Sequence, residues 1–418
     1  MSKIEIRTLP CGVRVVMEKI PYVQSVAVGI WVKTGSVNEE KKYAGISHYI
    51  EHMMFKGTEK RSARDIAADI DKIGGQMNAF TGKEATCYYV KVLRENFEKG
   101  AEVLLDMLNH SLFDKEDMKK ERQVICEEIK MTQDQPDDLA VDTVSEMLFA
   151  GNPLGNSIIG TPTTLNRISR NALKAYKEAQ YTRDSIVVAV AGNMDEDTVC
   201  AFFENQFSCL QAEKPVHQNG VTPYEKKYKV LVKDIQQSHL CLAVRAIPLD
   251  DPKYYAFSVL NNIMGGSMSS RLFQNIREEK GLAYSVYSML NTYSSDGSYM
   301  IYAGVAHDKI HRAIDGIREE LEILGRQGIT EEELSASREQ LKSSFIFGQE
   351  NVASRMFSIG KNLTLLGKVY TPEEVLDGLN AVTMEDIDEV KHMICDMNQY
   401  SAVAVTNRRI NLKSMMEG

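Results

Sequence analysis

The stretch His48-Tyr49-Ile50-Glu51-His52 decides how this chain is to be read. On a helix, residues four apart lie one turn apart on the same face, so both imidazoles can bind one metal ion. Glu51 lies beside them, where its carboxylate can take a proton from a water molecule at that ion. This order is the zinc-binding HxxEH pattern. The alternative is a pair of surface histidines on an amphipathic helix.

A zinc ion that activates water needs three protein ligands and an open position. Residues 121–130 have the pattern of a helix, and we expect Glu128 on it to be the third ligand. Glu121 precedes Glu128 by two turns on the same face, whereas Glu127 points about 100° away and is expected in solvent. The alternative for Glu121 is an ordinary solvated charge on a helix rich in charges.

The chain has 418 residues, which is too many for one hydrophobic core and suits two domains. Periodicity is lost over residues 207–226, where polar residues, Pro and Gly gather, so we expect a linker there. The predicted domains are a zinc-binding catalytic domain, 1–210, and a homologous domain without a metal, 227–418.

Composition excludes several classes of function. The net charge of −9 argues against a surface for nucleic acid or anionic membranes, and no run approaches 18 apolar residues. The 7 cysteines are scattered and never spaced as CxxC, which indicates reduced thiols in a cytoplasmic protein.

The second half repeats the element order of the first. In the first half we expect a helix over 43–55, a helix capped by Ser62, and strands over 76–81 and 84–92. Overlaying the helix that ends at Gly265-Gly266 on the first helix puts Ser258, Asn261 and Asn262 opposite His48, Glu51 and His52. We therefore predict an α+β fold of two homologous halves, each a mostly antiparallel β-sheet with helices packed on one face, arranged as a clamshell.

Residues 45–58, GISHYIEHMMFKGT, resemble the active-site helix of the pitrilysin/insulinase zinc metallopeptidases, most closely the branch of mitochondrial-processing-peptidase-like bacterial subunits. The interval of 76 residues from His52 to Glu128 (128 − 52) matches the spacing of that family. The resemblance implies that Glu121 is an auxiliary acidic residue near the metal. One departure is Asn152, where relatives often have His, and it lies outside the metal site.

Two further stretches carry the resemblance. An edge strand at Asn78, Ala79, Phe80 and Thr81 is similar to the one that pairs with the substrate backbone. Residues 269–285 resemble a C-terminal signature in which Arg277 and Tyr284 reach the substrate near the zinc. An Arg can bind a peptide carbonyl, and a Tyr hydroxyl can donate to a developing oxyanion.

The resemblance implies a zinc-dependent endopeptidase that cleaves short or unfolded peptides, with one Zn²⁺ per chain and Glu51 as general base. The implied catalytic residues are Glu51, Glu121, Arg277 and Tyr284. We expect a homodimer, because the chain carries both the metal motif and the Arg277/Tyr284 signature. The alternative is an inactive or partner-dependent scaffold subunit of a processing-peptidase-like complex.

Overall fold

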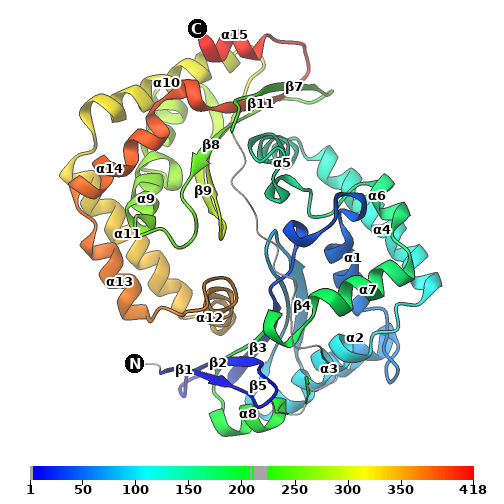
Figure 1. Cartoon of the computed structure of the whole chain (residues 1–418). Coiled ribbons are helices and arrows are strands. Elements are labelled where there is room, and N and C mark those ends of the chain that lie inside the picture. The colour runs from blue at the N-terminus through cyan, green and yellow to red at the C-terminus, as the bar shows by residue number, and fades with distance from the viewer. Residues whose placement is uncertain (1–2, 205, 208–209, 211–223) are drawn as a thin grey trace. The chain divides into compact units, whose positions relative to one another are not determined.

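The computed structural model describes residues 3–204, 206–207, 210 and 224–418 (Figure 1). They form two compact units, and each unit contains a segment from the other half of the sequence. Unit 1 takes its described residues from Met1–Ile129, Asn156–Gln218 and Ile346–Thr371. Unit 2 takes them from Lys130–Gly155, Asn219–Phe345 and Pro372–Gly418. Domains at 1–210 and 227–418 stay a prediction, and most of the expected linker at 207–226 lies outside the described residues.

The sheet of unit 1 has six strands in the order β1-β2-β6-β3-β5-β4. Neighbours are antiparallel except β2 and β6, which are parallel. The strands are β1 Ile4–Thr8, β2 Arg14–Lys19, β3 Ser25–Val32, β4 Gln76–Thr81, β5 Thr86–Leu93 and β6 Ile186–Gly192. The helices are α1 Ile46–Met54, α2 Ala63–Lys72, α3 Phe97–His110, α4 Lys115–Asp134 (whose last residues pass the unit boundary), α6 Pro162–Arg167, α7 Arg170–Gln180, α8 Glu196–Phe203 and α12 Val352–Leu366.

Alternation along β3 explains how both faces of this sheet are buried. Val26, Val28 and Ile30 belong to the core formed with the main layer of helices. Ala27 and Trp31 point to the opposite face and pack against α12. Because side chains alternate across a strand, one eight-residue strand supplies two separate cores.

The helix α12 comes from the second half of the sequence and covers the sheet of the first. Arg355 on α12 pairs with Glu18 on β2, with 3.0 Å between Nη2 and Oε1, and both side chains are buried. A Cβ atom on Gly360 would lie 2.1 Å from Nε1 of Trp31, so only glycine permits this close approach.

The sheet of unit 2 has five strands in the order β7-β11-β8-β10-β9, antiparallel except for β7 and β11. The strands are β7 Tyr228–Val232, β8 Ser238–Ala246, β9 Ala283–Thr292, β10 Gly297–Val305 and β11 Ser401–Thr406. The helices are α5 Pro136–Leu148, α9 Tyr254–Asn261, α10 Ile310–Gln327, α11 Glu331–Gln349 (whose last residues pass the unit boundary), α13 Pro372–Ala381, α14 Met384–Cys395 and α15 Leu412–Glu417, with π-helical turns η6 Asn262–Gly266 and η7 Phe273–Glu279. The helix α5, from the first half of the sequence, packs on β8 and β11.

The predicted fold class is confirmed: each unit is α+β with a mostly antiparallel sheet and its main helical layer on one face. The exchange of α5 and α12, one helix on the second face of each sheet, was not predicted. The clamshell arrangement of the two halves stays a prediction. Among the described helices, none is long and apolar enough to cross a bilayer.

Candidate metal centre

The helix α1, which carries the HxxEH stretch, is anchored at its N-terminus by a buried carboxylate. Glu39 accepts hydrogen bonds from the backbone N–H groups of Gly45, at 2.7 Å, and Ser47, at 2.8 Å. These are groups that a helix start leaves without an intrahelical partner. Gly45 has a φ of 93°, and a Cβ atom there would lie 2.8 Å from the carbonyl oxygen of Ile159. The first turn of α1 is therefore held on two sides.

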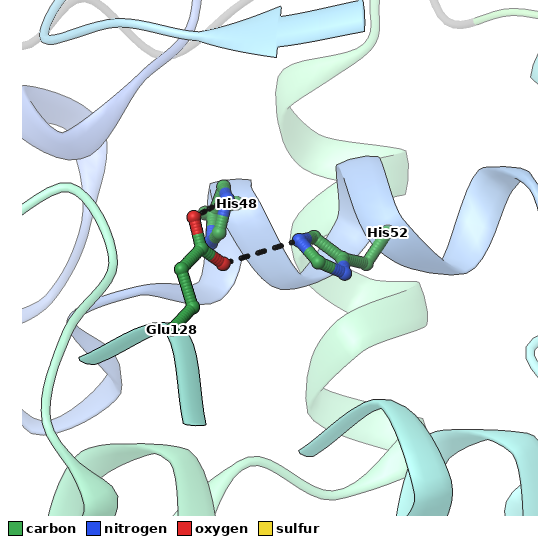
Figure 2. Close-up of side chains that lie close together, drawn as sticks. All are labelled: His48, His52 and Glu128. Atoms are coloured by element: carbon green, nitrogen blue, oxygen red, sulfur yellow. Dashed lines mark ion pairs between the residues drawn. The ribbon is translucent and has the colours of Figure 1, made fainter. Parts of the chain in front are cut away.

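His48 and His52 lie on successive turns of α1, and the carboxylate of Glu128 on α4 faces both of them (Figure 2). The distance from Nε2 of His48 to Oε1 of Glu128 is 3.7 Å, and from Nε2 of His52 to Oε2 it is 3.6 Å. One ligand atom from each residue lies within 4.8 Å of the other two. Among the described residues, this is the one group of His, Cys, Asp or Glu side chains with such geometry.

These three residues fit a zinc ion. In a tetrahedral site with bonds near 2.0–2.1 Å, neighbouring ligand atoms lie about 3.4 Å apart, close to the 3.7 and 3.6 Å that separate the two imidazoles from Glu128. Two imidazoles and one carboxylate form the donor set of several catalytic zinc sites, which leave the fourth position open. Both the distances and the chemistry of the donors therefore suit zinc.

The environment gives the two imidazoles different proton affinities. Burial, together with the neighbouring His52, lowers the pKa of His48 to about 4. Burial also acts to lower the pKa of His52, but its interactions with the carboxylates of Glu128 and Glu121 outweigh this and raise it. The ion pair with His52 in turn lowers the pKa of Glu128. At neutral pH, His48 is therefore already in the unprotonated form that a metal requires.

Glu121 lies behind His52 rather than in the ligand cluster. Its Oε2 lies 3.1 Å from Nδ1 of His52, and its Oε1 lies 2.7 Å from Nζ of Lys56. A carboxylate on the outer nitrogen of a ligating histidine fixes the tautomer that leaves the inner nitrogen free for the metal. Glu121 is 6% exposed, so the solvated alternative is wrong, whereas Glu127 is exposed as expected.

Glu51 and the edge strand β4 meet beside this cluster. The hydroxyl of Thr81, the last residue of β4, donates a hydrogen bond to Oε2 of Glu51. Burial raises the pKa of Glu51, and the hydrogen bond from Thr81 acts in the opposite direction. β4 lies at the end of the strand order, and Asn78 and Phe80 are exposed along it while Ala79 packs inward.

Arg277 and Tyr284 lie together in unit 2. The Arg277 guanidinium lies 5.7 Å from the centre of the Tyr284 ring and 4.7 Å from that of Phe273. The Tyr284 side chain is 77% exposed. Their contact with a substrate stays a prediction.

Comparison with known proteins identifies the family of this chain. The profile of the insulinase family (peptidase family M16) matches residues 14–162, and that of the M16 inactive domain matches residues 167–341. The chain belongs to the M16 peptidase family. A Bacillus subtilis protein named "uncharacterized zinc protease YmxG" is 44% identical over 377 residues, which are 90% of this chain and 92% of that protein. A Rickettsia felis protein named "uncharacterized zinc protease" is 37% identical, over 97% of this chain and 98% of its own length.

Two solved structures share the fold of this chain. A protease from Helicobacter pylori superposes with a TM-score of 0.89 at 21% identity, over 97% of this chain and all of its own. A structure described as a peptidase M16 inactive domain from Pseudomonas fluorescens also gives 0.89, at 18% identity, over 97% of this chain and 98% of its own.

In this M16 chain, neutral side chains of unit 2 form hydrogen bonds at the position that the overlay puts opposite His52. Asn262, which the sequence overlay puts opposite His52, donates a hydrogen bond of 3.0 Å to Oε1 of Gln340 on α11. A second bond of 3.0 Å from Asn262 reaches Oγ of Ser337. Hydrogen bonds from one neutral amide, to another amide and to a hydroxyl, thus join η6 to α11.

Two residues of the site escaped sequence reasoning. Lys56 lies two residues beyond the end of α1, where helical spacing no longer predicts which side chains meet, yet it pairs with Glu121. Glu39 carried no signal either, because it lies before α1 in an irregular segment and binds backbone N–H groups, which no side-chain pattern reveals.

Proposed function

We propose that this chain is a zinc-dependent endopeptidase of the HxxEH (inverzincin) type that hydrolyses peptide bonds of short or unfolded peptides. The observation that carries the proposal is the convergence of His48, His52 and Glu128 on one point, with the partly buried carboxylate of Glu51 beside them. The relatives named zinc proteases support it, since they match nearly the whole chain.

In this proposal His48, His52 and Glu128 hold one Zn²⁺ per chain. A zinc ion there would polarise the carbonyl of the peptide bond and lower the pKa of a water molecule. Glu51 takes the proton from the attacking water and passes it to the leaving amine. Because burial raises the pKa of Glu51, this carboxyl is better matched to proton transfer near neutral pH than an exposed one.

Glu121 contacts the ligand His52 rather than the metal position itself. It orients the ring of His52 through Nδ1, and Lys56 holds Glu121 in place by its own ion pair. Outer carboxylates of this kind typically change metal affinity or activity by about 10–100-fold when they are removed.

β4 provides the proposed track for the peptide. An edge strand offers backbone N–H and C=O groups to an added strand. The stretch Asn78, Ala79, Phe80 and Thr81 ends with Thr81, whose hydroxyl contacts Glu51. A peptide paired with this stretch would therefore pass close to the general base. Phe80 is 40% exposed and packs edge-on against Trp31 and Phe357, which gives the track an aromatic wall.

We further propose that Arg277 and Tyr284 bind the substrate, that the chain is a homodimer, and that it works in the cytoplasm. The six described cysteines are all free, which suits a reducing compartment. Light scattering on the active protein tests the dimer, and a fully active monomer would contradict it.

The test of function is cleavage of a quenched fluorescent peptide by the purified chain. We expect a chelator to stop cleavage and zinc to restore it. Glu51→Gln should retain one zinc ion and lose about 10²-fold or more in kcat, the usual contribution of a general base. The matched control is Glu127→Gln, which neutralises an exposed carboxylate and should cleave at the wild-type rate.

Two outcomes would contradict the proposal. Activity retained in Glu51→Gln would mean that another group takes the proton. A zinc-loaded wild-type chain that cleaves no peptide would favour the partner-dependent or scaffold subunit.

A further inference from the structure

The hydrogen bond between Thr81 and Glu51 joins the edge strand to the carboxylate beside the metal cluster. Thr81 shares its face of β4 with Met77 and Ala79, both of which pack on the core under the helices. Its hydroxyl therefore points toward α1, whereas the residues that alternate with it face the other way. The Thr81 side chain can thus contact Glu51 while the backbone edge of β4 stays free to pair with a peptide.

The same contact recurs in unit 2. Ser288 on the edge strand β9 donates hydrogen bonds to the backbone oxygen of Asn261, at 3.1 Å, and to Oδ1 of Asn261, at 2.9 Å. The sequence overlay puts Asn261 opposite Glu51. Ser288 also shares its face with the core residues Val286 and Leu290, as Thr81 does with its neighbours. In each unit, a hydroxyl on the edge strand thus donates to a residue of the helix that lies over it, a contact that we call the hydroxyl clamp. The residue held by the clamp is a carboxylate in unit 1 (Glu51) and an amide in unit 2 (Asn261).

We propose that Thr81 is a positioning residue for the reaction: its hydroxyl fixes one oxygen of Glu51 so that the other faces the water to be deprotonated. This inference rests on the proposed function. A Glu side chain has three rotatable bonds, and fixing it costs up to about 2 kcal/mol of conformational entropy unless a contact holds it beforehand. A preorganised base needs no such ordering during the reaction.

The clamp also links substrate docking to the chemistry. Thr81 is the last residue of β4 and the neighbour of the exposed Phe80. Because the hydroxyl itself points away from the peptide, its loss should change turnover rather than binding.

Three variants test the inference. Thr81→Val keeps the shape of the side chain and removes the donor, and Thr81→Ser keeps the donor. Ser288→Val removes the matching clamp of unit 2. The readouts are zinc content, the unfolding midpoint, and kcat and KM for a quenched fluorescent peptide.

We expect Thr81→Val to lower kcat about tenfold or more, in the range of outer contacts at metal sites, with zinc content and KM within about twofold of wild type. Thr81→Ser should restore most of kcat. Ser288→Val, which removes two hydrogen bonds of a buried hydroxyl, should lower the unfolding midpoint with an unchanged kcat.

An unchanged kcat in Thr81→Val would overturn the inference. Loss of zinc, or a rise in KM alone, would also overturn it, since the first assigns Thr81 to the stability of the site and the second to substrate binding. Failure of the proposed function is distinguishable, because it would leave the wild-type chain itself without zinc-dependent cleavage.

Discussion

The exchanged helix α12 gives a sharp prediction about stability. Arg355 is 6% exposed and Glu18 is 1% exposed, and their charged atoms lie 3.0 Å apart. Replacing Arg355 by Met keeps the apolar stem but leaves the Glu18 carboxylate buried without this cation. Breaking one side of a buried ion pair costs about 3–5 kcal/mol, a large part of the roughly 5–15 kcal/mol that stabilises a typical domain.

The assay is urea unfolding followed by tryptophan fluorescence. The chain has a single tryptophan, Trp31, which is 3% exposed and packs against α12, so its emission reports on unit 1. At a slope of roughly 2 kcal/mol per molar urea, the expected loss lowers the midpoint by about 1.5–2.5 M. The control is Arg7→Met, which breaks an exposed pair with Asp197 and should leave the midpoint almost unchanged.

A second substitution separates the charge from the packing. Glu18→Gln combined with Arg355→Met removes both charges and should recover more than half of the lost stability, because a neutral amide is far less costly to bury. A cost below about 1 kcal/mol for Arg355→Met alone would refute the argument, since it would mean that the pair does not hold α12 on the sheet.

Two more predictions follow from the electrostatics and the packing. Zinc binding to Glu51→Gln at pH 5.5 should release about one proton, whereas two ordinary imidazoles would release nearly two. Burial lowers the pKa of His48 to about 4, so this imidazole is already unprotonated at pH 5.5. Neighbouring carboxylates outweigh burial and raise the pKa of His52, so this imidazole must lose a proton to bind zinc. Zinc affinity therefore falls as the pH drops through the pKa of His52. Calorimetry in two buffers measures this, and a release near two would contradict it. Gly360→Ala should destabilise unit 1 by about 1–3 kcal/mol, because the new Cβ meets the buried indole. Gly348→Ala, with open space at its Cβ, should cost nothing in the same urea assay.

Local patterns predicted the elements of the site well. The helix expected at 43–55 is α1, and Ser62 caps α2 with Asp65, as the capping pattern indicated. The strands expected at 76–81 and 84–92 are β4 and β5. Each of these depends on residues close in sequence, where spacing alone determines which side chains share a face.

The helix exchange could not be predicted in the same way. The apolar residues Met356, Ile359 and Leu363 show that one face of α12 is buried, but not against which sheet. The partner that decides it, Glu18, lies more than 300 residues earlier in the chain. The hydrogen bond from Thr81 to Glu51 was likewise invisible, because the rotation of each side chain depends on tertiary packing.

The central claim is that His48, His52 and Glu128 together hold one zinc ion. Equilibrium dialysis against buffered zinc, followed by metal analysis, tests it most directly on folded wild-type and His48→Ala chains. The account predicts one zinc ion per wild-type chain and well under half of that for His48→Ala at the same free zinc concentration. Equal zinc content in both proteins would contradict it.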